Sequence, residues 1–289
     1  MRIAFLFSEY VLHNHIIERY HSLRPENELL VIKVPLTLRA KSRMESASSV
    51  LPKLSRRFIV AKLVEHLGLL TLTYCPKVMR RGAVFRRLSW ISRNVGAKYI
   101  ESTDINSQDT IAALQAFSPD VIITLMHQIV RKPLLAVPRL GVINIHPGLL
   151  PDFRGIQPYF WSLSEGAAEH GCTLHLIEDE SIDTGGVLAQ HRFSLSNVRS
   201  VQLSYYLTAL GAAQLLPEVL DKFSRGELTA SSQATDSGSY YRWPDSAAYQ
   251  RLWERRASLF RISDIWGILS GRYDSSLPTS TPGKRDAVL

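Results

Sequence analysis

Cysteine is scarce in this sequence. Only Cys75 and Cys172 occur in 289 residues, far apart and without a CxxC pair. Disulfide-stapled scaffolds and four-cysteine zinc sites both need more thiols than this. The only HxH pattern, at His13 and His15, has no further ligand nearby, so the sequence predicts no metal site. We expect two reduced, buried thiols in a cytoplasmic protein.

Long apolar runs and a leader peptide are also missing. The longest apolar stretch, residues 58–75, is interrupted by Lys62, Glu65 and His66, whereas a membrane helix needs about 20 predominantly apolar residues. The opening MRIAFLF is too short for the apolar region of a secretory signal. We therefore expect no membrane span. With 45% hydrophobic residues, the chain can build the core of one large domain.

Acidic residues are nearly absent between residues 37 and 94. This segment holds 13 Lys and Arg against Glu45 and Glu65, a net charge of +11 in a chain whose total is +8. A patch of that sign attracts polyanions such as nucleic acids or nucleotide diphosphates. Two surface helices with solvated basic faces, at residues 52–70 and 78–94, explain the pattern equally well. The role of the segment therefore stays open.

Strand-like and helix-like patterns alternate along the rest of the chain. Short apolar runs predict buried strands at residues 2–7, 29–34, 98–100, 121–125, 142–145, 172–177 and 187–193. Helical patterns lie between them at residues 11–21, 107–117, 157–165 and 200–223. This alternation predicts an α/β fold with a doubly wound, mostly parallel sheet. Ligands of such sheets bind beyond the carboxyl ends of the strands.

The composition changes after residue 223. Residues 226–239 are small and polar, and an aromatic-rich stretch follows, made of Tyr240, Tyr241, Trp243, Tyr249, Trp253, Phe260 and Trp266. Residues 239–244 could form an aromatic shelf for a substrate ring, with Arg242 meeting a phosphate. The spacing of Trp253 and Trp266 instead favours a helix face packed on the core or on a second subunit of a homodimer. Residues 274–289 are rich in Ser, Pro and Thr and are expected to be disordered.

No serine or cysteine lies in a nucleophile elbow, so covalent acyl-enzyme chemistry has no candidate. A different set of polar residues follows the predicted strands. Asn144 and His146 share a face at the end of the strand at 142–145, and Asp183 lies in an acidic loop between two later strands. An amide and a protonated imidazole donate hydrogen bonds to an oxyanion, and a carboxylate orients the imidazole and raises its pKa. The set suits acyl transfer to an attacking amine.

Three motifs give these residues a specific context. Residues 144–155 read NIHPGLLPDFRG, residues 171–175 read GCTLH and residues 182–185 read IDTG. Together they resemble the folate-dependent formyltransferase family, over residues 96–215 strongly and over residues 1–35 loosely. The resemblance implies a Rossmann-like catalytic domain at residues 1–223 with a basic helical insertion at about 36–95. A small appendage at 224–273 and a disordered tail at 274–289 would complete the chain.

The resemblance also implies the site. Asn144, His146 and Asp183 match the family's catalytic triad, with 10-formyltetrahydrofolate as formyl donor and tetrahydrofolate as product. Two segments match positions that hold the pterin, largely through backbone groups: Met126, His127, Gln128, Ile129 and Val130, and Ile177, Glu178, Asp179 and Glu180. The acceptor is expected near Ser8, Glu9, Tyr10, Gly148, Arg154 and Tyr159.

Departures from the family pattern narrow the acceptor. Ser8, Glu9 and Tyr10 stand where glycinamide ribonucleotide transformylase has a glycine-rich phosphate loop, which argues against that substrate. Gly148 stands where Ser is frequent. The run from Arg154 to Trp161 resembles the sugar N-formyltransferase branch, so we expect a small primary amine, for example a nucleotide-linked amino sugar, as acceptor. A methionyl-tRNA-type or other RNA-linked enzyme, a formyltetrahydrofolate hydrolase and a catalytically retired folate-binding regulator remain alternatives.

Overall fold

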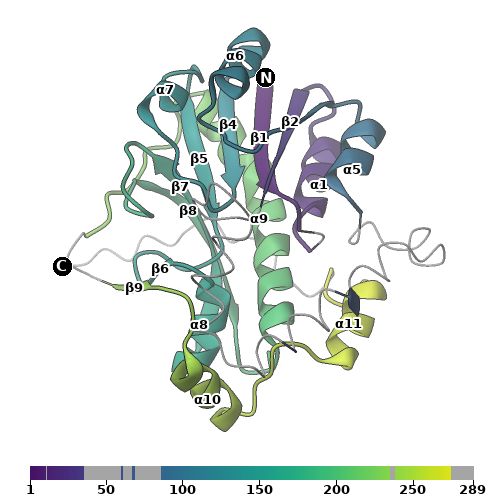
Figure 1. The fold of residues 1–289 in the computed structure, drawn as a ribbon, viewed down its shortest axis with the longest axis vertical. Helices are drawn as coiled ribbons and strands as arrows, with labels where there is room; N and C mark the ends of the chain where they lie inside the picture. The colour runs from purple at the N-terminus through teal and green to yellow at the C-terminus, as the bar shows by residue number, and fades with distance from the viewer. Residues whose placement is uncertain (11, 36–59, 61–66, 69–85, 235–237, 275–289) are drawn as a thin grey trace.

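The computed structural model describes residues 1–10, 12–35, 60, 67–68, 86–234 and 238–274. Its centre is one seven-stranded sheet, which contains the seven predicted strands (Figure 1). The strand order is β3 (Lys98–Glu101), β2 (Glu28–Val34), β1 (Arg2–Ser8), β4 (Val121–Leu125), β5 (Gly141–His146), β7 (Glu169–Ile177) and β8 (Val187–Ser194). The first five run parallel, whereas β7 pairs antiparallel with β5 and with β8. The prediction of an α/β, mostly parallel sheet is confirmed.

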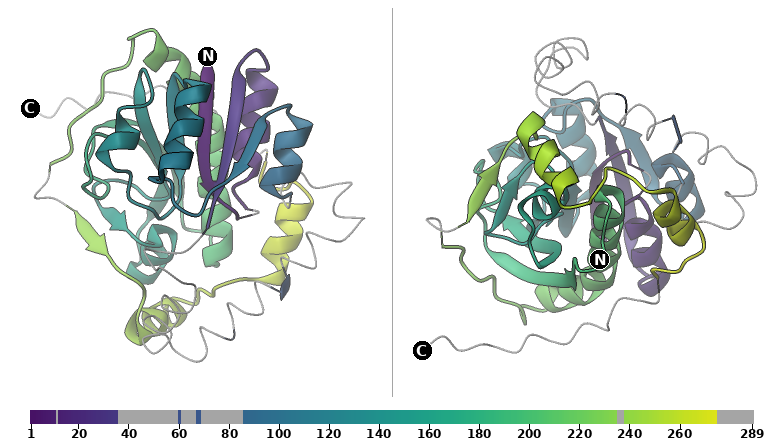
Figure 2. Two further views of the ribbon diagram at one scale, coloured as in Figure 1. Left: turned by 45° about the horizontal axis from the view of Figure 1, so that its top comes forward. Right: turned by 90° about the horizontal axis from the view of Figure 1, so that it is seen from below.

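Alternation along the strands sends side chains to two separate apolar layers. On β1, Ile3, Phe5 and Phe7 belong to one layer, and Ala4 and Leu6 to the other. Helices cover both layers, as the two views of Figure 2 show. One layer is covered by α1 (His15–Leu23), α5 (Leu88–Asn94) and α9 (Val201–Ser224), and the other by α6 (Gln108–Phe117) and α7 (Lys132–Leu135). Because both faces are covered, the central strands β1 and β4 are buried and almost entirely apolar.

Helix boundaries follow capping chemistry where the sequence supplies it. Ser107 accepts a hydrogen bond from the Thr110 N–H at the start of α6, and Ser200 does the same at the start of α9. The helix expected over residues 11–21 is shorter at its start, since α1 begins at His15 after a turn. Most of the expected helix at 52–70 and residues 78–85 of the next lie outside the described residues, as does Cys75. Cys172 is fully buried, and burial raises the pKa of its thiol to about 12.

The C-terminal part returns across the end of the sheet. The three-residue strands β6 (Phe153–Gly155) and β9 (Ser239–Tyr241) pair in parallel and form a second, small sheet that the sequence did not predict. Next come α10 (Ser246–Glu254), which packs on α8 (Pro158–Glu165), and α11 (Ile262–Leu269), which packs on α9. None of the described helices combines the length and apolar character that a membrane crossing requires.

The aromatic residues of this part divide into buried and exposed ones. Tyr249 is fully buried, and Tyr241 stacks on Trp161 of α8 at 4.7 Å between ring centroids. Trp253 and Trp266, by contrast, lie on two different helices and are 39% and 67% exposed. The two tryptophans therefore do not line one helix face packed on the core, and their packing on a second subunit stays a prediction. Helical spacing identifies residues that share a face, but not whether anything covers that face.

Candidate active site

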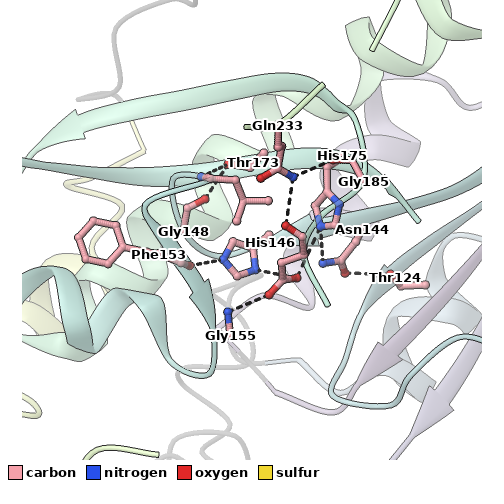
Figure 3. Close-up of polar contacts among 12 residues, drawn as sticks. Thr124, Asn144, His146, Gly148, Phe153, Gly155, Thr173, His175, Gly185 and Gln233 are labelled. Atoms are coloured by element: carbon pink, nitrogen blue, oxygen red, sulfur yellow. Dashed lines mark hydrogen bonds and ion pairs between the residues drawn. The ribbon is translucent and has the colours of Figure 1, made fainter. Parts of the chain in front are cut away.

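Strand β5 delivers two polar side chains to its carboxyl end. Asn144 and His146 are two residues apart and therefore point to the same side of the sheet, toward His175 on the neighbouring β7 (Figure 3). The Asn144 Oδ1 accepts a hydrogen bond of 2.9 Å from the Thr124 hydroxyl at the end of β4. Its amide Nδ2 lies 3.1 Å from the His175 Nε2. The amide is thus held at both ends, and one of its two hydrogens has no acceptor among the described residues.

Asp183 comes to the same place from the loop between β7 and β8. Its Oδ1 lies 3.3 Å from the His146 Nδ1 and 3.7 Å from the His175 Nε2. Its Oδ2 accepts a 2.9 Å hydrogen bond from the backbone N–H of Gly155 in β6. The expected convergence of Asn144, His146 and Asp183 is therefore found, although 37 residues separate the histidine from the carboxylate.

The contacts of His146 fix its protonation. Its Nε2 lies 2.6 Å from the carbonyl oxygen of Phe153, and its Nδ1 faces the Asp183 carboxylate. Both partners are acceptors, so both ring nitrogens carry hydrogen and the ring is an imidazolium. Burial lowers the pKa of His146, but the charge and hydrogen bond of Asp183 and the Phe153 carbonyl outweigh it, and the pKa is raised. Burial likewise raises the pKa of Asp183, yet the charge and hydrogen bond of His146 hold it well below its usual range.

His175 belongs to the cluster but was not among the predicted site residues, although it ends the GCTLH motif. Its Nδ1 lies 2.8 Å from the Leu176 carbonyl, so Nδ1 carries a hydrogen and Nε2 is left to accept from Asn144. Its place in the GCTLH motif was the signal in the sequence. The structure adds that His175 stands directly opposite Asn144 in the β5–β7 ladder. Gln233, which also touches the site, comes from the polar segment after α9, and no sequence pattern distinguished it.

The loop after β5 is held close to His146. The Thr173 hydroxyl donates a 2.7 Å hydrogen bond to the Gly148 carbonyl. A Cβ on Gly148 would come within 2.6 Å of the Pro158 Cβ and 2.9 Å of the His146 Nε2. Gly148 therefore lets the start of α8 approach His146 closely, and a serine at this position would require one of these groups to shift.

The two segments expected to hold the pterin lie beside this cluster. Within the described part of the chain, no backbone N–H of residues 127–129 donates a hydrogen bond, so these groups are available to a ring with acceptor atoms. The side chain of Gln128 instead bonds to the backbone of Thr103 and Ile105, 3.0 Å away in each case. The Glu178 carboxylate accepts a 3.0 Å hydrogen bond from Gly186 and thereby closes the second segment. The two segments also contain Met126, Ile129, Val130, Ile177, Asp179 and Glu180.

His127 adds an unsatisfied polar atom to the first of these segments. Its Nδ1 is buried and has no hydrogen-bond partner among the described residues. Burial lowers the pKa of His127 even though the nearby Asp183 pulls it upward. A neutral imidazole with an unsatisfied nitrogen can bind a polar group of a ligand. Together with the available backbone N–H groups, it makes this edge of the sheet fit a pterin.

The positions expected to hold the acceptor do not all face the catalytic cluster. The Glu9 carboxylate accepts 2.9 Å hydrogen bonds from Asn14 and from the N–H of Leu88, so it anchors α5. Ser8 is buried at the end of β1. Tyr10 and Tyr159 both pack on Tyr205 of α9, at 5.2 and 4.6 Å between ring centroids. Arg154 lies in β6, next to Gly155.

Metal ligation is not a feature of the described residues. No group of three or more His, Cys, Asp and Glu side chains among them is arranged to hold a metal ion. Hydrogen bonds and an ion pair instead link Asn144, His146 and Asp183 to one another or to neighbouring groups, with one amide hydrogen of Asn144 uncommitted. The cluster is therefore organised around charge and hydrogen bonding at a single point of the sheet edge.

Solved structures with a similar fold include formyl-transferring enzymes. Glycinamide ribonucleotide transformylase 1 from Symbiobacterium toebii has a TM-score of 0.54 and 18% identity, and the match covers 81% of this chain and 92% of that one. An N-formyltransferase from Helicobacter canadensis, solved with folinic acid and dTDP-3-aminofucose, has a TM-score of 0.56 and 14% identity, covering 89% and 81%. At these identities the likeness is one of fold.

Sequence comparison gives a narrower result. The methionyl-tRNA formyltransferase of Synechococcus sp. (strain JA-3-3Ab) is 35% identical over 151 residues, which is 52% of this chain and 46% of that protein. The methionyl-tRNA formyltransferase of Roseiflexus sp. (strain RS-1) is 32% identical over 179 residues, or 61% and 54%. The chain spans about half the length of the curated relatives it matches. The model of the formyl transferase family matches residues 55–220, more than half of the sequence and the stretch that carries Asn144, His146 and Asp183, and so the chain belongs to the formyl transferase family.

Proposed function

We propose that this protein transfers a formyl group from 10-formyltetrahydrofolate to a primary amine. The observation that carries the proposal is the 3.3 Å contact between His146 and Asp183, beside an Asn144 amide with an uncommitted hydrogen. This arrangement supplies a fixed positive charge and a hydrogen-bond donor where a carbonyl oxygen would become an oxyanion. Membership of the formyl transferase family supports formyl as the transferred group.

In the proposed reaction the amine nitrogen attacks the formyl carbon, and the carbonyl electron pair moves to the oxygen. Asn144 stabilises the oxyanion by donating its second amide hydrogen. His146 acts through its charge, since both of its N–H groups are directed at Asp183 and the Phe153 carbonyl. The bond from carbon to N10 then breaks. The oxygen's electron pair re-forms the carbonyl, and N10 gains one proton as the amine nitrogen loses one. A formamide and tetrahydrofolate leave, and His146 stays an imidazolium throughout.

Asp183 has a defined part in this scheme. A carboxylate with so low a pKa is a poor proton acceptor at equilibrium. Its main role is therefore to keep His146 charged and oriented, and it relays the amine proton toward solvent only as the intermediate forms. Backbone groups of residues 126–130 and 177–180 hold the pterin in this proposal, with His127 supplying a polar contact.

The acceptor has two candidate classes. A small amine, including a nucleotide-linked amino sugar, agrees with the Arg154-to-Trp161 pattern. It also agrees with Glu9 and Tyr10, which stand after β1 where a phosphate loop would need bare amides. Methionyl-tRNA is the second candidate, and the identities to enzymes of that name support it. The basic segment at 37–94, largely outside the described residues, fits either a tRNA or a diphosphate.

A panel assay tests the proposal. The protein is mixed with 10-formyltetrahydrofolate and, separately, with amino-sugar nucleotides, amino acids or methionyl-tRNA, and the release of tetrahydrofolate is followed. Release that requires one acceptor class identifies it. Release without any acceptor indicates a hydrolase, and folate binding without release indicates a retired regulatory protein; either result contradicts the proposal. A steep loss of activity with salt marks RNA binding, because phosphate contacts release counterions.

A further inference from the structure

A segment from beyond α9 runs across both loops that carry the catalytic cluster. We call its described residues, 231–234 and 238–241, the return segment. Ser231 exchanges two backbone hydrogen bonds of 2.8 Å with Val187 at the start of β8. Farther along, β9 pairs with β6, and the N–H of Ile156 donates to the Tyr241 carbonyl at 2.9 Å. The return segment thus connects the loop of Asp183 with the loop that follows His146.

Gln233 makes the direct contact to the Asp183 loop. Its amide nitrogen donates one hydrogen bond to the backbone carbonyl of Asp183, at 3.1 Å, and another to that of Gly185, at 2.7 Å. Figure 3 shows this amide above the cluster. Both hydrogens of one side chain are therefore used to hold two carbonyls of a single turn.

That turn has an unusual backbone. Asp183 has a φ of 56°, in the left-handed region, which Asp enters more readily than most non-glycine residues but still at a cost in free energy. Gly185 is equally constrained, because a Cβ there would come within 2.0 Å of the Leu176 carbonyl. A strained conformation persists only where its surroundings hold it. The paired hydrogen bonds from Gln233 are such a restraint, and they act on the residue that carries the carboxylate.

The other end of the return segment holds the carboxylate's second partner. Gly155, whose N–H binds the Asp183 Oδ2, lies in β6 so close to β9 that a Cβ would be 2.2 Å from the Tyr241 carbonyl. The Tyr241 ring stacks on Phe153, 5.6 Å between centroids, and the Phe153 carbonyl binds His146. One segment therefore restrains both the backbone of Asp183 and the groups on either side of its carboxylate.

We infer that Gln233 is a positioning residue that holds the Asp183 turn in its left-handed form and so keeps the carboxylate aligned with His146. The inference rests on the proposed function for its kinetic consequence. The expected effect of Gln233 on the pKa of His146 does not rest on it, because the alignment of Asp183 determines the charge on His146 whatever the reaction is. A purely structural role for Gln233 would lower stability without changing His146.

Gln233→Met tests the inference, because methionine has the same length and no donor, and, unlike glutamate, adds no charge beside His146. We expect kcat for formyl transfer to fall about tenfold to a hundredfold, with KM for 10-formyltetrahydrofolate changed less than about threefold, as a misplaced group costs rate rather than binding. The pKa of His146, titrated by ¹H–¹⁵N NMR of the ring, is expected to fall. Ser231→Ala is the matched control, since it keeps both backbone bonds to Val187, and should match the wild type in both measurements.

The outcomes separate the two proposals. An unchanged His146 pKa in Gln233→Met overturns the inference, even if the variant is less stable. A wild-type protein that transfers no formyl group contradicts the proposed function, while the NMR titration still decides the role of Gln233. If the Met variant does not fold, Gln233→Asn carries the same test, because a shorter amide reaches one carbonyl at most and should lower the pKa of His146 by a smaller amount.

Discussion

Two histidines lie at the same edge of the sheet, His13 after β1 and His146 at the end of β5. Both are almost completely buried, at 3% and 2% exposure, but their surroundings favour a neutral ring for His13 and a charged ring for His146. His13 accepts from the Tyr205 hydroxyl and donates to the Ser8 carbonyl at 2.8 Å, and burial lowers its pKa to about 3. His146 has a carbonyl and a carboxylate as partners, and its pKa is raised. Burial alone therefore discharges an imidazole, and one carboxylate reverses the result.

The largest expected effect comes from removing that carboxylate's charge. In Asp183→Asn, His146 stays buried without its counter-charge, so its pKa should fall below 6.5 and the ring should become neutral like His13. Formyl transfer should fall about 10²- to 10³-fold or more, the range for losing an electrostatic stabiliser of an oxyanion. Steady-state kinetics with the identified acceptor measure the decrease.

Glu169→Gln is the matched control, because it removes an exposed carboxylate that lies 3.8 Å from Arg192. Activity within twofold of wild type in Asp183→Asn would exclude the electrostatic role.

Asn144→Ala removes the hydrogen-bond donor but leaves the charged pair in place. We expect kcat to fall about 10²-fold, with 10-formyltetrahydrofolate binding retained, because the pterin segments do not depend on this amide. Fluorescence titration with the folate and the rate assay separate the two effects. A loss of folate binding that accounts for the whole decrease in rate would show that Asn144 shapes the pocket and does not act on the oxyanion.

Tyr205→Phe probes the neutral histidine of the pair. The substitution removes the hydroxyl that donates to the His13 Nδ1 and leaves a buried acceptor unsatisfied. The free energy of unfolding should decrease by about 1–3 kcal/mol, measured by urea denaturation. The same variant should leave the His146 pKa unchanged in an NMR titration. A change at His146 would show that the two histidines are coupled and that their comparison does not hold.

The smallest effect is the pH dependence of the His146–Asp183 pair. Because the pKa of His146 is raised above 6.5, the pair's stabilisation is complete below pH 6.5 and is lost as pH rises through the folded value. Because the pKa of Asp183 is lowered from 3.8, the stabilisation is present above pH 3.8 and is lost as pH falls below it. Each unit by which the His146 pKa is raised contributes about 1.4 kcal/mol.

Urea unfolding of the wild type and Asp183→Asn between pH 3 and 9 checks this window. The difference in free energy between the two proteins should be largest between pH 3.8 and 6.5. The difference in free energy of unfolding should become smaller below pH 3.8 and above pH 6.5. A difference that grows steadily with rising pH would mean that His146 is neutral in the folded protein.

The sequence predicted the sheet and the convergence of Asn144, His146 and Asp183 because both depend on strong local patterns. Residues 3–7 are apolar throughout and residues 121–125 are apolar except for Thr124, which is typical of a strand covered on both faces. Asn144, His146 and Asp183 were found because they stand in motifs at strand ends. The antiparallel direction of β7 and β8 agrees with the short connection at residues 178–186.

The remaining features depend on contacts between distant segments. The strands β6 and β9 have three residues each, too few to show a periodicity, and 83 residues separate their ends. Gln233 lies among small polar residues that any loop could contain. The spacing around Trp266 predicts a helix, but it does not show whether another segment covers the helix face that carries Trp266. In each case the deciding partner is remote in the chain, and no local pattern reports it.

The ladder between β5 and β7 links catalytic geometry to correct folding. Asn144 lies opposite His175 and His146 opposite Thr173, while the alternate residues Ile145 and Leu174 face each other in the core. A shift of one residue along this ladder would bring leucines to the polar cluster and histidine into the apolar layer. The same strand register therefore serves both faces of the ladder. A chain that pairs Ile145 with Leu174 in its core has already aligned Asn144 with His175 and His146 with Thr173.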